Sequence, residues 1–117
     1  MSESSIHQTI QNPLTREIVV DKCKKANFKE IKNINLWSCE LDDISLIREM
    51  PNLEVVSMSV NRIESLQYFA SCLKIQELYL RKNNISEIRE VQHLVGLKKL
   101  RVLWLSDNPC SKEQYYR

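Results

Sequence analysis

The chain has 117 residues, 43% of them hydrophobic and 27% charged, which suits one soluble globular domain with a modest core. Its formal net charge of +2 is too small to indicate a nucleic-acid partner by itself. No apolar run approaches the ~20 residues of a membrane span, and one glycine with three prolines excludes a low-complexity chain.

The N-terminal part divides into a tail and a helix. Residues 1–13 are polar and lack the apolar stretch of a signal peptide, so we expect a disordered tail. Residues 14–27 are predicted to form a helix, since Thr15 can cap its start and apolar residues recur at helical spacing. A stack of repeats exposes its core at each end, so we interpret this helix as a cap.

A pattern of six positions then recurs every 22 residues within 28–110. Its three full copies are Ile31, Ile34, Leu36, Cys39, Leu41, Ile44; Leu53, Val56, Met58, Asn61, Ile63, Leu66; and Ile75, Leu78, Leu80, Asn83, Ile85, Ile88. A fourth copy opens 25 residues later with Leu100, Leu103, Leu105 and Asn108. This spacing is typical of leucine-rich repeats. It predicts an α/β fold, a right-handed leucine-rich-repeat solenoid with about four repeats and an N-terminal capping helix.

Each repeat should contain a strand, a turn and a short convex-side helix or 3₁₀ turn. The strands are expected near residues 34–36, 56–58, 78–80 and 103–105. Asn61, Asn83 and Asn108 should bond backbone groups inside their turns. Cys39 takes this position in the first repeat, so that turn should be looser. Three extra residues within 91–99 predict a longer helical turn.

The cysteines carry a weaker signal. The four cysteines form no C-x-x-C pair, which favours reduced thiols over a disulfide framework or a zinc site.

Side chains between the buried leucines should point onto a concave face, because strand side chains alternate. The predicted partner-binding residues on that face are Trp104, Tyr79, Arg81, Glu77, Val102 and Trp37. Exposed Trp, Tyr and Arg are enriched at interface centres. The alternative for Trp104 is that it merely covers the end strand. For Trp37 the alternative is burial by the cap helix.

Two further features have ordinary explanations. Lysines crowd the cap region, at Lys22, Lys24, Lys25, Lys29 and Lys32, and indicate a solvated face more than an acidic partner. Catalysis has no support, because His7 and His93 lack neighbours for nucleophilic chemistry and no glycine-rich phosphate loop exists. We therefore expect no enzyme activity, no cofactor, no catalytic residues and no metal site.

The 22-residue form resembles the SDS-type leucine-rich-repeat family, which includes a phosphatase regulator, a spliceosomal U2 protein, tubulin-folding cofactors and an axonemal dynein light chain. Within it, several stretches are similar to the cilia- and flagella-associated members. These are 14–16, 43–45, 49–56, 59–61, 77–81 and, with its R-V-L-W-L and N-P-C blocks, 100–110.

The resemblance implies a protein-binding scaffold at the basal body, acting in cilium assembly and cytoskeleton organisation, and located in the cytoplasm, cytoskeleton and cilium. It also implies a NIMA-related kinase as a kind of partner, although the family's kinase-binding helical region lies outside the similar stretch. No membrane or nucleic-acid partner is expected. The resemblance also implies a link to DNA repair. A ribonucleoprotein subunit like the spliceosomal relative and a phosphatase regulatory subunit remain as alternatives.

The C-terminal cap of the resembled family continues well past the N-P-C block. The resemblance therefore implies that residues 111–117 are an incomplete C-terminal cap of a fragment or short form. This predicts that Leu103 and Leu105 are exposed at the end of the stack and that the isolated chain is marginally stable.

Overall fold

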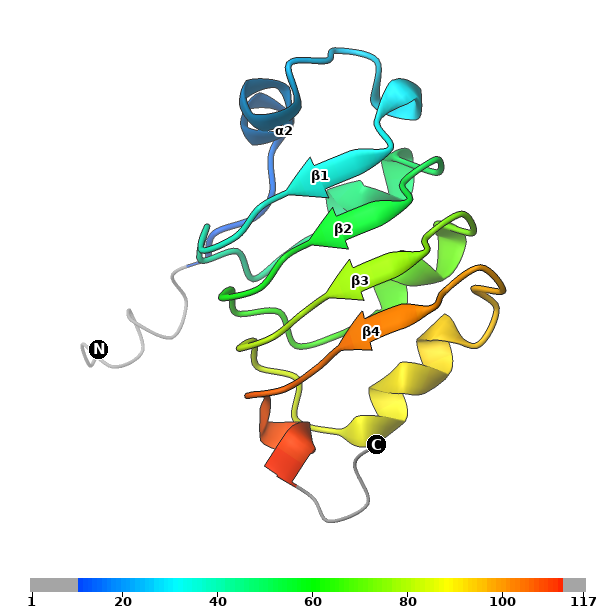
Figure 1. Ribbon diagram of the computed structural model, residues 1–117. Helices are drawn as coiled ribbons and strands as arrows, with labels where there is room; N and C mark the ends of the chain where they lie inside the picture. The colour runs from blue at the N-terminus through cyan, green and yellow to red at the C-terminus, as the bar shows by residue number, and fades with distance from the viewer. Residues whose placement is uncertain (1–10, 113–117) are drawn as a thin grey trace, which may run out of the picture.

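The computed structural model describes residues 11–112 and shows a stack of four repeats closed by a helix (Figure 1). The only α-helix among the described residues is α2 (Arg16–Cys23). Four strands make one parallel sheet in sequence order: β1 (Asn33–Asn35), β2 (Val55–Ser57), β3 (Glu77–Tyr79) and β4 (Val102–Trp104). The 3₁₀ helices are η1 (Phe28–Glu30), η2 (Ser45–Glu49), η3 (Gln67–Ser71), η4 (Ile88–Leu94) and η5 (Pro109–Lys112). The predicted fold class is confirmed.

Each strand begins one residue earlier than predicted. The sheet already pairs Asn33 with Val55, and Val55 with Glu77. These first residues carry exposed or half-buried side chains, which a pattern of buried apolar positions does not reveal. The central residue of each strand, such as Val56 or Leu78, points into the core as expected.

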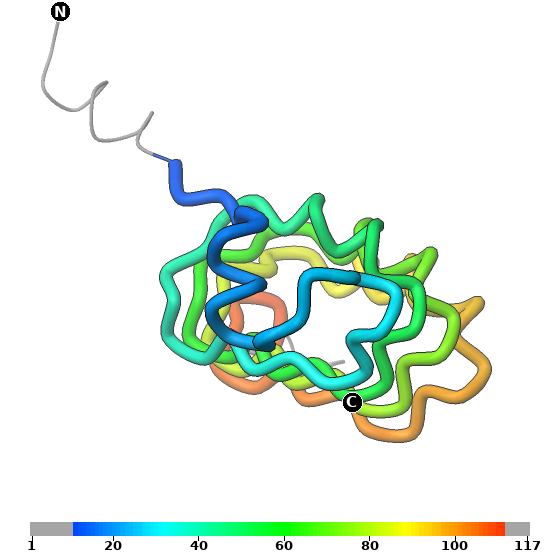
Figure 2. Tube along the Cα trace, turned by 90° about the horizontal axis from the view of Figure 1, so that it is seen from above, coloured from blue at the N-terminus to red at the C-terminus, as the bar shows by residue number. Residues whose placement is uncertain are grey.

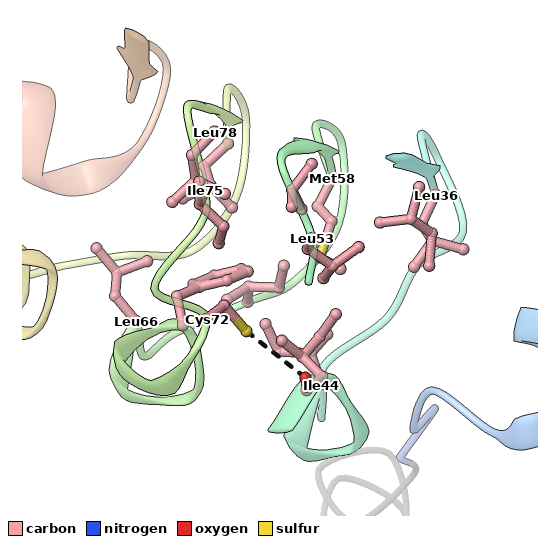
Figure 3. Packing of buried hydrophobic residues seen from close by; sticks show 14 of the residues in the cluster. Leu36, Ile44, Leu53, Met58, Leu66, Cys72, Ile75 and Leu78 are labelled. Atoms are coloured by element: carbon pink, nitrogen blue, oxygen red, sulfur yellow. Dashed lines mark hydrogen bonds between the residues drawn. The ribbon is translucent and has the colours of Figure 1, made fainter. Parts of the chain in front are cut away.

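The core lies between the sheet and the 3₁₀ helices, and successive repeats interlock within it (Figure 3). Leu53, Ile75 and Leu78 are fully buried. Cys72 occupies a core position, where its thiol donates to the Ile47 carbonyl at 3.6 Å between sulfur and oxygen. The predicted longer helical turn is η4, which has seven residues and ends before Gly96.

Three buried asparagines hold the turns of neighbouring repeats together, as predicted. Asn61 accepts a hydrogen bond from the backbone N–H of Leu41 at 2.8 Å. It donates to the carbonyls of Leu36 and Met58 at 3.0 and 2.8 Å. Asn83 and Asn108 repeat this arrangement one and two repeats further on. Each side chain thus satisfies backbone groups that the curved chain would otherwise bury unpaired.

The N-terminal cap differs from the prediction in its extent. The Thr15 side chain caps α2 as expected, accepting from the Ile18 N–H, and Val19 is fully buried. However, α2 ends at Cys23 rather than continuing to residue 27, because Lys24 adopts a left-handed conformation. Seen along the stack in Figure 2, α2 crosses the end of the first repeat.

Part of the predicted disordered tail is ordered. Asn12 donates through its amide to the carbonyls of Cys39 and Glu40, both at 3.0 Å, and Pro13 forms a parallel bridge with Asp43. The prediction is therefore wrong for Asn12 and Pro13, while residues 1–10 lie outside the described residues. Asn12 supplies an amide to the turn in which Cys39 replaces asparagine.

The C-terminal end of the stack is better covered than expected. Leu105 is only 2% exposed, so the prediction that it is exposed is wrong, and Leu103 is half-buried. The physical reason is η5, which folds back so that the Cys110 N–H donates to the Ile85 carbonyl at 2.9 Å. Residues 113–117 of the predicted cap lie outside the described residues.

Val60 is strained, and relieving the strain should stabilise the protein. Its φ of 61° is in the left-handed region, which is costly for a β-branched residue. Asparagine tolerates this conformation better, so we expect Val60→Asn to raise the free energy of unfolding by about 0.5–1 kcal/mol in urea titrations. Val55→Asn is the control, because Val55 lies in an extended strand and should lose stability. Equal losses of unfolding free energy in the two variants would contradict the hypothesis that Val60 is strained.

Candidate protein-binding face

The sheet face turned away from the 3₁₀ helices carries the predicted site residues. The strand register places Tyr79 opposite Trp104 and Glu77 opposite Val102 on β3 and β4. Trp104 is 51% exposed, and the other three are half-buried. The structure therefore brings four of the six predicted residues onto two adjacent strands.

An aromatic pair is the centre of this group. The rings of Tyr79 and Trp104 meet edge to face, with centroids 6.0 Å apart and planes inclined by 61°. Such an arrangement is favourable for aromatic pairs and limits the side-chain freedom of both residues. Its consequence is a preformed apolar surface rather than two independent flexible rings.

The Glu77 carboxylate accepts hydrogen bonds from two side chains, one of them Tyr79 of the aromatic pair. The Tyr79 hydroxyl donates to Glu77 Oε1 at 2.6 Å, and Arg101 donates to Glu77 Oε2 at 3.0 Å. The hydrogen bond from Tyr79 lowers the pKa of Glu77, and the bond from Arg101 adds to this effect. The bond between Tyr79 and Glu77 also raises the pKa of Tyr79. Tyr79 thus has a fixed hydroxyl orientation at neutral pH.

Sequence reasoning missed Arg101 and Asp107. Arg101 immediately precedes Val102, the register partner of Glu77, and this cross-strand proximity could have identified it. Asp107 follows β4 and forms an ion pair with Arg81, with 3.0 Å between Nε and Oδ2. Arg81 is therefore already paired and lies at the margin of the aromatic pair rather than offering an isolated charge.

Trp37 stands apart from the other predicted residues. It is 61% exposed, so the alternative of burial by α2 is excluded. It follows β1, which β2 separates from β3, and the intervening strand spacing places it roughly 10 Å or more from the Tyr79 row. The structure does not bring Trp37 into contact with the aromatic pair.

The described residues provide no alternative chemical centre. Within residues 11–112 no cluster of three or more His, Cys, Asp or Glu could hold a metal ion. No helix in that range is long and apolar enough to cross a membrane. Burial raises the pKa of the Cys72 thiol to about 11, which keeps it protonated and unreactive at neutral pH. His7 lies outside the described residues, and His93 is near Glu90 on η4.

Comparisons with known proteins agree with this architecture. A family model described as Leucine Rich repeats (2 copies) matches residues 74–113. Several solved structures similar to this chain are repeat solenoids, among them an internalin, InlF, of Listeria monocytogenes. It has a TM-score of 0.63 and 22% identity, covering 89% of this chain and 28% of the internalin.

This chain folds as a leucine-rich-repeat domain. Mouse cilia- and flagella-associated protein 410 is 44% identical to it over 97 residues, which confirms the resemblance expected from the motifs. The match covers 83% of this chain but 39% of the mouse protein, so the chain spans about two fifths of that relative. Leucine-rich-repeat proteins of this kind are typically non-catalytic scaffolds that bind other proteins.

A solved complex from Drosophila melanogaster also has this fold. The Drosophila melanogaster SNF/U2A′ complex contains a chain with a TM-score of 0.61 and 20% identity, covering 92% of this chain and 76% of that one. At this low identity the likeness shows the fold alone.

Proposed function

We propose that this leucine-rich-repeat protein binds a protein partner on its concave face, centred on Trp104 and Tyr79, and acts as a scaffold in cilium assembly at the basal body. The observation that carries the binding part is the exposed edge-to-face pair of these two rings. The ciliary part is supported by the name of the mouse relative at 44% identity.

The local chemistry suits an interface centre. Trp104 offers a large apolar surface with little side-chain entropy left to lose, because Tyr79 already restrains it. The nearby Glu77 and Arg101 neutralise each other, so an apolar partner surface would not have to bury an unpaired charge. Val102 and the Arg81–Asp107 pair would then form a mixed rim.

Trp104→Ala should weaken partner binding by about 2 kcal/mol or more, because it removes the exposed centre of the proposed contact. Affinity-tagged wild-type chain and variant would be compared in quantitative pull-downs from ciliated-cell lysate. The partner found would then be titrated against each purified chain. Circular dichroism checks the fold, which should survive because the Trp104 side chain faces outward.

Two controls make this test specific. Val20→Ala removes an exposed apolar side chain from α2, and Lys24→Glu with Lys25→Glu alters the charge of the cap. Neither should change binding by more than about twofold. Loss of partners with the lysine variant, but not with Trp104→Ala, would place the contact on the cap and refute the concave site. Localisation of the tagged chain away from basal bodies would refute the ciliary role alone.

A further inference from the structure

The parallel sheet separates charges between its two edges. Because β1–β4 run in the same direction, the segments that enter the strands lie along one edge and those that leave lie along the other (Figure 1). The entering segments are residues 27–32, 50–54, 72–76 and 95–101. They contain two acidic residues, Glu30 and Glu54, and six basic ones: Lys29, Lys32, Lys74, Lys98, Lys99 and Arg101. We call these six residues the basic edge.

The leaving segments have the opposite balance. Residues 36–44, 58–66, 80–87 and 105–108 contain three basic residues and six acidic ones. The net charges of the two edges are therefore +4 and −3. The overall charge of +2 hides this separation, which appears only when the repeats are stacked.

Backbone contacts show that the entering segments are immediate neighbours. The N–H of Glu54 bonds the carbonyl of Lys32 at 2.6 Å, and the N–H of Gln76 bonds that of Glu54 at 2.7 Å. The N–H of Arg101 in turn bonds the carbonyl of Gln76 at 2.8 Å. Equivalent positions thus follow one another at about the 4.8 Å strand spacing.

The lysines of the basic edge are unneutralised. Arg101 is paired with Glu77, but within residues 11–112 none of the five lysines forms an ion pair. On the opposite edge, Arg62 pairs with Glu40 and Arg81 with Asp107. All five lysines are exposed, so the positive charges are available to an anionic partner.

The remaining side chains favour an acidic polypeptide as that partner. Phe28, the aromatic residue of the entering segments, is buried, and nucleic-acid surfaces usually combine basic residues with exposed rings. The large apolar residues that are exposed in the entering segments are Leu73 and Val95, which are too few for stable insertion into a membrane. Leu73 beside Lys74 instead suits an extended chain in which acidic residues alternate with apolar ones.

We propose that the basic edge binds an extended acidic segment of a partner protein, at a surface separate from the concave aromatic pair. The segment crosses the stack of repeats, so that its carboxylates meet lysines from more than one repeat. This contact is independent of the proposed concave interface, and the two can be tested apart.

The test uses a fluorescein-labelled oligomer of about 12 glutamates, titrated with the full chain by fluorescence anisotropy at an ionic strength of about 50 mM. Lys98→Glu with Lys99→Glu should weaken binding at least about tenfold. The matched control is Lys82→Glu with Arg89→Glu, which makes the same change in net charge near the opposite edge and should alter binding less than about threefold. Trp104→Ala should leave this affinity unchanged.

Several results would overturn the proposal. Equal losses from both double variants would mean that only net charge matters. Tighter binding of the wild type to phosphatidylserine vesicles, or to single-stranded RNA of equal charge, would assign the basic edge to a membrane or a nucleic acid. If the glutamate variant fails to fold by circular dichroism, Lys98→Gln with Lys99→Gln replaces it, and a loss under about twofold then counts against the proposal.

Discussion

Leu78→Ala should lower the free energy of unfolding by about 2–5 kcal/mol. Leu78 is fully buried at the centre of β3, with a register partner on each side in Val56 and Leu103. Truncation would leave a cavity between two repeats whose backbones are held by sheet and asparagine hydrogen bonds, so the walls cannot collapse onto it. Urea or guanidinium titration, monitored by circular dichroism, measures the loss.

Leu73→Ala is the matched control for this truncation, because it removes the same atoms from a side chain that is 59% exposed. We expect a change of no more than about 0.5 kcal/mol there. Similar losses at Leu73 and Leu78 would show that burial does not determine the effect, and that the assignment of core positions is wrong.

The repeat pattern was sufficient to predict the fold because the apolar residues that recur at regular spacing are the residues that form the core. Leu53 and Ile75, for example, are equivalent residues of successive repeats, and each repeat directs this side chain into the core. The role of Asn61 was also predictable, because a polar residue at a repeated buried position must satisfy backbone groups.

The errors arose where contacts cross between segments without periodicity. Asn12 bonds the turn at Cys39 from 27 residues away, and no repeat signals that contact. Leu105 is buried because η5 folds back over the end of the stack, which depends on contacts of the last repeat alone. Both corrections concern the ends of the repeat stack, where a repeat lacks a neighbour on one side and is covered by contacts that do not recur elsewhere in the chain.

The candidate site was predictable in position but not in chemistry. Alternation along β3 and β4 places Tyr79 and Trp104 on the outer face without any coordinates. The partners of the charged residues depend on side-chain conformations: Arg101 donates to Glu77, and Arg81 forms an ion pair with Asp107. These pairs make the surface around the rings less charged than the sequence indicates.

Asn83→Asp should cost about 3 kcal/mol or more at neutral pH, although the two side chains have the same shape. Asn83 is 8% exposed, and its amide group donates to the carbonyls of Met58 and Leu80 at 3.0 and 3.1 Å. A carboxylate can still accept from the Ile63 N–H, but it cannot donate to these carbonyls and its charge would be buried beside them. Denaturant titration against the wild type measures the loss.

The pH dependence distinguishes this cause from a loss of packing. The two carbonyls and burial would raise the pKa of the new carboxyl in the folded state above its unfolded value of about 3.9. The penalty relative to the wild type is therefore complete above the folded pKa and shrinks as the pH falls through it, because the protonated acid can donate again. Asn35→Asp makes the same chemical change on an exposed side chain, whose oxygen can still accept from the Trp37 N–H, and should cost no more than about 0.5 kcal/mol. A penalty at Asn83 that does not change with pH would mean that the buried donor is not what holds the repeats together.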